Sequence, residues 1–444
     1  MVSGCALLSA CLESARLPLA AGTGPHPELP APQRTLIPTV NIAPAVGWPI
    51  GATPTAAQGT RVVAFAQGLS HPRWLLLLPN GDLLVAESNA PAKGTQNSAG
   101  LLERIKGWVM AKVMQRAGAG VPSADRITLL RDTDGNGTAD LRTPFLTGLH
   151  SPFGMALVDG RLLVANTDEV LWFPYASGDT RIVAPGTRLV ALPGGAINHH
   201  WTRSLLASAD GRHLYVGVGS NSNVAERGME AELGRASVWQ VDIATGDHRL
   251  FATGLRNPVG MAWAHPSASA TAVSEAPPVL WAVLNERDEL GSDLVPDYLT
   301  SVRADGFYGW PYSYYGQHVD ARVKPGDPAR VATARLPDFA LGAHVAPLGL
   351  ASSTGSTLPV PFTQGMFVGL HGSWNRRPQS GYQVVFVPFR DGRPAGPMVE
   401  LLGGFLSPEG EAWGRPVGVA VDTRGGVLVA DDVGNTIWRV TATP

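Results

Sequence analysis

A unit of two apolar strands joined by a polar turn occurs six times along the chain. Each copy opens with a short loop, usually containing proline, and the second strand often ends in Val-Ala or a similar pair. The copies cover residues 70–86, 151–165, 200–216, 256–283, 346–369 and 415–430. Several carry Asp-Gly or Asn-Gly between their strands, which favours a tight hairpin turn. Six such units with irregular spacing predict six small sheets joined by loops of variable length.

A single sheet of this kind cannot bury both of its faces. Radial packing of six sheets around an axis solves this problem and leaves only short, protected edges. We therefore predict an all-β, six-bladed β-propeller over residues 59–444. The 52 glycines and 37 prolines also favour many short strands joined by turns. Equivalent loops then meet at one end of a central channel, where a ligand site is expected.

The two cysteines, Cys5 and Cys11, both lie near the N-terminus. The predicted propeller therefore has no disulfide, thiolate metal site or thiol nucleophile. The segment 8–11, Leu-Ser-Ala-Cys, resembles a bacterial lipobox, in which the cysteine is acylated. We expect residues 1–11 to be the remnant of a signal segment, and a periplasmic or other extracytoplasmic protein with a lipid on Cys11. The alternative is an ordinary apolar terminus.

Two further segments lie outside the repeats. Residues 12–58 are rich in proline and alanine and predict a linker or an extended arm wrapped on the domain. Residues 100–118 place apolar side chains at helical spacing, which predicts an insertion helix packed on the propeller. An element at the rim of the channel, or a membrane-surface contact, is the alternative for this helix. The formal net charge of −2 gives no electrostatic footprint for nucleic acid.

Two adjacent histidines open the third copy, and an arginine opens the fourth. Successive side chains of an extended loop point apart, so at most one of His199 and His200 is expected to face the channel. A neutral histidine can take the hydroxyl proton when an alcohol is oxidised. Arg256 occupies the equivalent place in the fourth copy and can stabilise a developing oxyanion. The alternatives are structural histidines and a surface arginine.

Acidic and basic clusters follow later copies. The segment 285–298 is dense in carboxylates and offers the oxygen ligands that calcium prefers, although a solvated acidic loop is an equal alternative. Arg376 and Arg377 follow the fifth copy, and Arg415 opens the sixth. Clustered guanidinium groups in a channel suit a polycarboxylate ligand. The alternative is a set of solvated surface arginines.

The loop from Asp132 to Asp140 resembles the first part of an EF-hand loop. It lacks the glutamate at the twelfth position, and flanking helices are not evident. A structural calcium site and a hairpin turn without metal are equal alternatives here. The chain shows no dinucleotide fingerprint, phosphate loop or nucleophile elbow.

Several motifs together resemble the L-sorbosone dehydrogenase branch of the soluble quinoprotein sugar dehydrogenases, from about residue 60 onward. They are the segments 255–260, 285–288, 295–298 and 307–311, in this order. The ordered set is specific, whereas any one motif alone is weak. The resemblance implies a six-bladed propeller that binds pyrroloquinoline quinone (PQQ) and Ca²⁺ on the channel axis. It implies oxidation of a sugar or sugar-derived aldehyde by hydride transfer to the quinone.

The resemblance also assigns roles to single residues. It implies that His200, ten residues before Asp210, accepts the substrate hydroxyl proton. It places Arg256 near the C5 oxygen of the quinone. The implied cofactor contacts are Asn257, His344, Arg376, Arg377 and Arg415, and the implied calcium ligands are Glu286, Arg287 and Asp288. In the glucose-oxidising relatives the calcium stretch is Gln-Gly-Pro and uses backbone carbonyls, which leaves the role of the two acidic side chains open.

The predicted function is therefore that of a PQQ- and calcium-dependent dehydrogenase acting on a sugar or a sorbosone-like aldehyde, with an unidentified electron acceptor. A calcium-dependent lactonase or esterase, or a non-catalytic extracytoplasmic binding propeller, are the alternatives, because fold alone does not decide function. The cationic set and the His-Arg pair in successive loops favour the dehydrogenase. We expect a small-molecule substrate, no nucleic acid, and membrane contact only through a lipid on Cys11.

Overall fold

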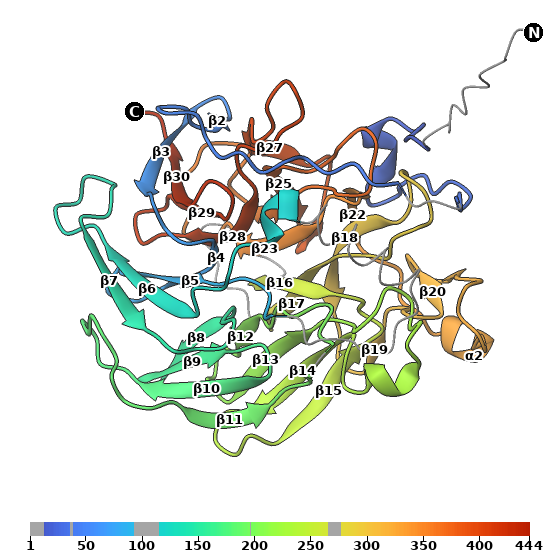
Figure 1. The fold of residues 1–444 in the computed structure, drawn as a ribbon, viewed down its shortest axis with the longest axis horizontal. Helices are drawn as coiled ribbons and strands as arrows, with labels where there is room; N and C mark the ends of the chain where they lie inside the picture. Colours follow the sequence, from blue (N-terminus) through green and yellow to red (C-terminus); the bar gives the residue numbers. More distant parts are fainter. Residues whose placement is uncertain (1–12, 36–38, 93–114, 196, 265–276) are drawn as a thin grey trace, which may run out of the picture.

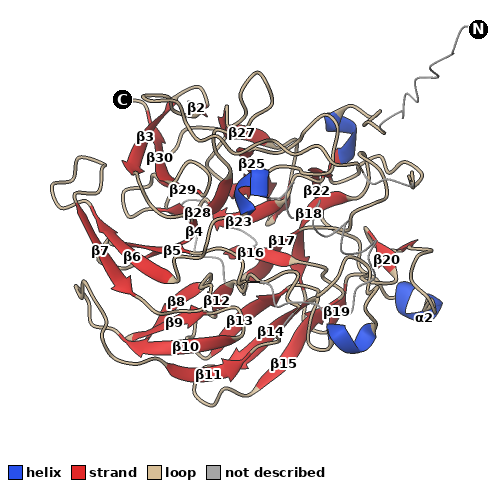
Figure 2. Ribbon diagram, viewed as in Figure 1, coloured by secondary structure: helices blue, strands red, loops and turns tan. Residues whose placement is uncertain are grey.

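The computed structural model describes residues 13–35, 39–92, 115–195, 197–264 and 277–444, and these consist mainly of short strands and loops (Figure 2). Six sheets of four or more strands lie around a common axis (Figure 1). The fold is thus the six-bladed β-propeller predicted from the repeats. We number the sheets as blades 1 to 6, in the order of their innermost strands along the chain.

The strands of each blade run from the axis outward. Blade 1 contains β4 (Pro72–Leu77), β5 (Leu83–Glu87), β6 (Arg126–Arg131) and β7 (Leu141–Leu146). Blade 2 contains β8 (Met155–Val158), β9 (Arg161–Ala165), β10 (Glu169–Pro174) and β11 (Thr187–Ala191). Blade 3 contains β12 (Leu205–Ala207), β13 (His213–Val218), β14 (Ser237–Asp242), β15 (His248–Thr253) and β19 (Gly306–Phe307). Blades 4 to 6 contain β16 (Pro258–Ala264), β17 (Val279–Leu284), β18 (Pro296–Val302), β22 (Phe339–Ala343) and β1 (Thr23–Gly24); β23 (Pro347–Ser352), β24 (Gly365–Leu370), β25 (Gln383–Arg390), β27 (Val399–Gly403) and β2 (Thr55–Ala56), with β26 (Arg393–Pro394) beside β25; and β28 (Pro416–Val421), β29 (Val427–Asp431), β30 (Thr436–Ala442) and β3 (Thr60–Ala66).

The first strand of each predicted copy is the innermost strand of a blade. These six strands contact one another in a ring, and β28 returns to β4. Glycines in the inner strands permit this close approach. A Cβ on Gly260 would lie 2.7 Å from the backbone nitrogen of Leu350 in the next blade, and one on Gly349 would collide with the carbonyl of Val417. The recurring glycine in these loops and strands is thus a packing requirement near the axis.

The ring closes by pairing the start of the propeller with its end. Strand β3 pairs antiparallel with β30, with Thr60 opposite Ala442, so the fourth strand of blade 6 comes from the other end of the domain. The core lies between neighbouring blades. Trp281 of blade 4 packs against Phe389 of blade 5 with ring centroids 4.9 Å apart, for example. Because both faces are covered, all five residues of β5 and of β29 are buried.

The described parts of the segment 13–58, residues 13–35 and 39–58, lie against the propeller as an arm. Its strand β1 adds to the outer edge of blade 4, and β2 adds to blade 5. Figure 1 shows this segment crossing from blade 4 towards blades 5 and 6. The remaining short elements are the helices η1 (Leu19–Gly22), η2 (Gln115–Ala119), η3 (Met229–Glu232) and α2 (Pro328–Val331), and the hairpin of β20 (Ser313–Tyr314) and β21 (His318–Val319).

Two predicted segments fall mostly outside the described residues. The signal remnant 1–11 lies there entirely, as do residues 100–114 of the predicted insertion helix. Residues Gln115–Ala119, at the end of that prediction, form a short helical segment that is kinked at Gly118, where φ is 89°. Within the described ranges, no helix has the length and apolar character needed to cross a bilayer.

Candidate active site

Buried carboxylates hold the loops at one end of the channel. Asp431, at the end of β29, accepts a hydrogen bond from the backbone N–H of Arg415 at 2.8 Å. Asp297 of β18 accepts hydrogen bonds from the backbone N–H groups of Glu286 at 2.7 Å and Ala346 at 2.8 Å. Burial raises the pKa of Asp431 to about 6 and that of Asp297 to about 8. The backbone of the loops that carry Glu286, Ala346 and Arg415 is therefore held in place by buried carboxylates.

His200 lies in the loop before β12, and its ring has a defined tautomer. Its Nδ1 lies 2.8 Å from the carbonyl oxygen of Ser220 and 3.1 Å from the Ser220 hydroxyl oxygen. A carbonyl only accepts, so Nδ1 carries the proton and Nε2 is the unprotonated nitrogen. Burial, then His199 and Arg256, lower the pKa of His200 well below its ordinary value. The ring is thus neutral at neutral pH and can accept a proton at Nε2.

His199 meets the His200 ring edge to face, with centroids 4.7 Å apart and an interplanar angle of 86°. The two rings therefore point in different directions, as extended backbone requires. The side chain of His199 is exposed, yet desolvation by the surrounding protein and the charge of Arg256 lower its pKa to about 4. Its backbone N–H donates to the side-chain oxygen of Asn221 at 3.2 Å.

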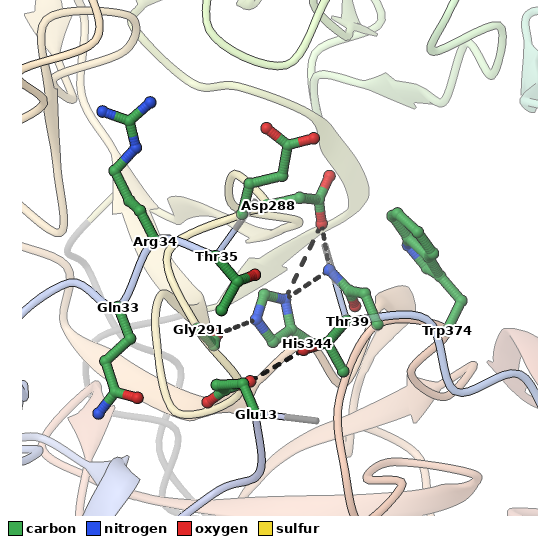
Figure 3. A pocket seen from close by; sticks show the side chains of 11 residues that line it. Glu13, Gln33, Arg34, Thr35, Thr39, Asp288, Gly291, His344 and Trp374 are labelled. Carbon is green, nitrogen blue, oxygen red and sulfur yellow. Dashed lines mark hydrogen bonds and ion pairs between the residues drawn. The ribbon is translucent and has the colours of Figure 1, made fainter. Parts of the chain in front are cut away.

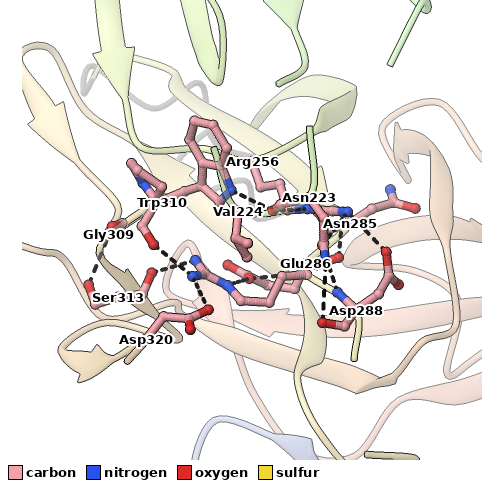
Figure 4. Close-up of polar contacts among 12 residues, drawn as sticks. Asn223, Val224, Arg256, Asn285, Glu286, Asp288, Gly309, Trp310, Ser313 and Asp320 are labelled. Carbon is pink, nitrogen blue, oxygen red and sulfur yellow. Dashed lines mark hydrogen bonds and ion pairs between the residues drawn. The ribbon is translucent and has the colours of Figure 1, made fainter. Parts of the chain in front are cut away.

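Arg256 is buried, and its guanidinium group is saturated with acceptors (Figure 4). It donates from Nη1 to the carbonyl oxygens of Glu286 at 2.5 Å and Asn285 at 3.3 Å. From Nη2 it donates to the side-chain oxygen of Asn223 at 3.0 Å and to Asp288 Oδ2 at 3.0 Å. The arginine therefore joins blade 3 to the loop after β17 and lies among the residues expected to bind calcium.

The three predicted calcium ligands separate into two groups. Arg287 is fully buried between Glu286 and Asp320, at 3.0 Å from a carboxylate oxygen of each. Burial lowers the pKa of Arg287, but these two carboxylates outweigh it, and the net effect is a raised pKa. Asp288 instead faces Arg256 and is partly exposed. Among the described residues, no three His, Cys, Asp or Glu side chains are grouped so that they could hold a metal ion.

Asn257 and His200 approach each other across Gly219. A Cβ on Gly219 would collide with the Asn257 side chain and lie 2.5 Å from His200 Cβ, so only glycine fits there. The side-chain oxygen of Asn257 is buried and has no hydrogen-bond partner. A buried amide oxygen without a partner is rare, and it indicates a place where a ligand can donate a hydrogen bond.

His344, predicted to contact the cofactor, lies beside Asp288 in the loop before β23 (Figure 3). Its Nε2 donates to the carbonyl oxygen of Gly291 at 3.0 Å, which leaves Nδ1 to accept from the Asn375 side-chain nitrogen at 3.3 Å. The same nitrogen of Asn375 donates to Asp288 Oδ1 at 2.8 Å. The side-chain oxygen of Asn375 is buried without a partner.

The three predicted arginines lie near the arm. Arg376 pairs with Asp293 at 3.5 Å, and Arg415 donates to the carbonyl oxygen of Ala43 at 3.2 Å. The Nε atoms of Arg376, Arg377 and Arg415 are all buried without a hydrogen-bond acceptor. These unsatisfied cationic donors are what a polycarboxylate ligand requires.

A second polar cluster was not identified from the sequence. Asp432, which follows β29, is buried and pairs with Arg73, with His371 Nε2 at 2.9 Å and with His71 Nε2 at 3.5 Å. These residues come from the loops or strands of blades 1, 5 and 6. The signal was available for His71, because it stands directly before the proline that opens the first copy.

The EF-hand-like loop connects β6 to β7. Asp132 pairs with Arg424 at 3.0 Å and accepts from the Gly137 N–H, while Asp140 accepts from Thr133. Its carboxylates thus bind the loop's own backbone and an arginine of blade 6. Asp132 Oδ1 alone is buried without a partner.

Two family models match parts of the chain. A TrAA12-like family matches residues 327–443, and a domain of unknown function, DUF7133, matches residues 61–264. An uncharacterized protein of Borreliella burgdorferi is 25% identical over 303 residues, covering 66% of this chain and 76% of that protein. A PQQ-dependent pyranose dehydrogenase of Coprinopsis cinerea is 23% identical over 366 residues. That match covers 75% of this chain but only 44% of the fungal protein.

Solved structures are similar over most of the chain. The holo form of the pyranose dehydrogenase PQQ domain from Coprinopsis cinerea has a TM-score of 0.68 at 20% identity, covering 90% of this chain and all of that domain. A Trichoderma reesei carbohydrate-active enzyme of family AA12 has a TM-score of 0.67 at 20% identity, covering 91% and 99% of the two chains. The chain therefore has the propeller fold of these two fungal proteins.

Proposed function

We propose that this protein is a quinoprotein dehydrogenase that oxidises a sugar with PQQ as its cofactor. The observation that carries the proposal is His200, a neutral histidine whose Nδ1–H binds the Ser220 carbonyl and whose Nε2 is therefore the unprotonated nitrogen. The fold and sequence likeness to a protein named as a PQQ-dependent pyranose dehydrogenase supports it. So does the resemblance of the motifs in the sequence.

The described residues fit a tricarboxylate quinone. The buried, unpaired donors of Arg376, Arg377 and Arg415 can bind carboxylates, and the unpaired oxygen of Asn257 can accept a hydrogen bond. When bound, PQQ would accept a hydride from the substrate carbon. His200 would take the substrate hydroxyl proton at Nε2, while the Nδ1–H bond to Ser220 holds the ring in that tautomer. Arg256 would supply positive charge beside the reacting oxygens.

Calcium fits the described side chains less well. The carbonyl oxygens of Asn285 and Glu286 and one oxygen of Asp288 already accept from Arg256, and the other Asp288 oxygen accepts from Asn375. The Glu286 carboxylate is tied to Arg287, although its Oε1 lacks a partner. The sequence left open whether side chains or backbone carbonyls bind calcium, and oxygens of both kinds are engaged by other residues here, so the proposed chemistry does not use calcium. Calcium stays a prediction as a second cofactor, and titration of the purified protein with calcium tests it.

Reconstitution tests the proposal. The purified protein should show little dye-coupled sugar oxidation until PQQ is added, and the added quinone should then be reduced by substrate. Lactone or ester hydrolysis that requires calcium, in a preparation free of quinone, would instead support a lactonase. Binding of sugars without any turnover would support a non-catalytic propeller.

The narrower assignments rest on the sequence. We propose an extracytoplasmic location, with a lipid on Cys11, because Leu-Ser-Ala precedes this cysteine alone. Mass spectrometry of the mature N-terminus tests this, and an unmodified terminus would refute it. An L-sorbosone-like aldehyde is the proposed substrate within the sugars. A screen of aldoses and sugar aldehydes with a dye acceptor tests that assignment.

A further inference from the structure

The arm and the propeller enclose a pocket beside the candidate active site (Figure 3). The arm contributes Glu13 and Thr39 to one wall, and the propeller contributes Asp288, Trp374 and Asn375 to the other. Because Asp288 also pairs with Arg256, the pocket adjoins the residues proposed to act on the substrate.

The arm wall is anchored by specific contacts. Glu13 accepts hydrogen bonds from the backbone N–H of Ser292 at 2.9 Å and its hydroxyl at 2.6 Å, and from the Thr39 hydroxyl at 3.0 Å. Asn41 donates from its backbone to the carbonyl oxygen of Trp374 at 2.8 Å. These bonds fix the arm against the two loops that form the opposite wall, so the pocket is a built feature.

The polar groups of the pocket select a neutral ligand rich in hydroxyl groups. Its lining holds three carboxylates, Glu13, Asp288 and Glu289, against the single arginine Arg34. This excess of negative charge repels the carboxylates of a quinone, which the arginines elsewhere in the site attract. The side-chain nitrogen of Asn375 binds Asp288 and His344, which fixes the orientation of the amide. The side-chain oxygen of Asn375 is buried and has no hydrogen-bond partner.

We propose that this pocket is a sugar-binding subsite, in which the Trp374 ring contacts a pyranose face and the Asn375 oxygen accepts a sugar hydroxyl. The inference rests on the proposed function, since it places part of the sugar substrate beside Asp288. Amphipathic rings suit such a ligand, because an aromatic face covers apolar C–H groups while the polar neighbours bind the hydroxyls. The arm is then a part of the substrate site, and it determines which sugars fit.

Sugar binding to the quinone-free protein tests the inference without requiring catalysis. Saturation-transfer NMR with D-glucose should show binding to the wild-type protein. Trp374→Ala and Asn375→Ala should weaken it by roughly three- to tenfold, the size of a lost contact or hydrogen bond. Trp374→Phe, which keeps a ring, should bind like the wild type. Arg16→Ala is the matched arm control, because Arg16 is exposed and contacts Asp293 only through its backbone.

The holoenzyme gives a second readout. Trp374→Ala should raise KM for the sugar and leave kcat and PQQ affinity nearly unchanged. Equal glucose binding by all variants would overturn the inference, as would a calcium-induced thermal shift that disappears in Glu13→Gln while glucose binding is unaffected. A failure of the proposed function would look different: no sugar would reduce added PQQ, while Trp374→Ala would still lower glucose binding.

Discussion

Two groups that each combine histidine, arginine and carboxylate side chains lie in the loops of this propeller, and they differ in what binds the histidine. In the first, the Nδ1–H of His200 binds a backbone carbonyl and Nε2 is unprotonated, while Arg256 pairs with Asp288. In the second, Asp432 pairs with Arg73 and accepts a hydrogen bond from His371 Nε2, and His71 Nε2 lies 3.5 Å from it. The first group therefore holds its histidine through a neutral carbonyl beside a partly exposed carboxylate, whereas the second group centres on a buried carboxylate that joins three blades.

The largest expected effect is on the rate of quinone reduction, and it follows from the unprotonated Nε2 of His200. His200→Ala should slow reduction of bound PQQ by substrate by roughly two to four powers of ten, the usual cost of losing a positioned base. His371→Ala is the matched change in the second group and should leave this rate nearly unchanged. Stopped-flow absorbance measures both. A slow His371 variant together with a normal His200 variant would reverse the roles of the two groups.

The second group should instead dominate stability. Asp432→Ala leaves Arg73 buried without its carboxylate, and breaking a buried pair in this way costs about 3–5 kcal/mol in the free energy of unfolding. Asp288→Ala is the control, because that carboxylate is partly exposed and its loss should cost less. Urea denaturation measures the difference. Equal losses in the two variants would contradict a purely structural role for Asp432.

The contribution of Arg256 to PQQ binding can be compared with that of calcium. Arg256→Ala should weaken PQQ binding by roughly tenfold or more, because hydrogen bonds to charged groups contribute about 1.5–3 kcal/mol. Chelation of calcium in the wild-type protein should have the smaller effect, since Arg256 already occupies the candidate ligand oxygens. Fluorescence titration measures both, with Arg212→Ala as an exposed control. If chelation abolishes binding and Arg256→Ala does not, calcium is the essential cation.

The histidine of the second group predicts a pH dependence of stability. Burial, opposed by Asp432, lowers the pKa of His371 to about 4. Unfolded histidine binds a proton near pH 6.5, whereas the folded ring resists protonation until about pH 4, so the unfolded state gains protons first. The free energy of unfolding should therefore fall as the pH decreases from about 6.5 to 4. His371→Gln should reduce this slope, and an unchanged slope would show that His371 titrates normally.

The same contrast shows what the sequence could predict. The inner strands begin at or just after the expected prolines, at Pro72, Pro258 and Pro416, because the repeat combines turn residues with apolar runs that leave little choice of structure. The repeat placed the two adjacent histidines near the channel, and the choice of His200 rests on the family resemblance and stays a prediction. The tautomer of His200 was not predicted, because the Ser220 carbonyl that fixes it lies in a separate loop.

Contacts between distant segments account for what the sequence did not predict. Arg287 is buried because Glu286 and Asp320, which follows a later hairpin, both pair with it. The Asp432 group joins three copies of the repeat, and no single copy shows it. The course of the arm could not be predicted either, because a proline-rich segment without periodicity does not indicate which surface it covers.

The smallest expected effect is that of His199→Ala, and it tests whether His200 or its neighbour His199 is the base. His199→Ala should lower the rate of quinone reduction much less than His200→Ala, because the two rings are nearly perpendicular and, among the described residues, no hydrogen bond holds the His199 ring in one tautomer. A residual effect is expected, since His199 is among the groups that lower the pKa of His200, and its removal should let that pKa rise. The acid limb of the pH–rate profile should then move to higher pH in His199→Ala. A His199 variant that is inactive beside a normal His200 variant would shift the base by one residue.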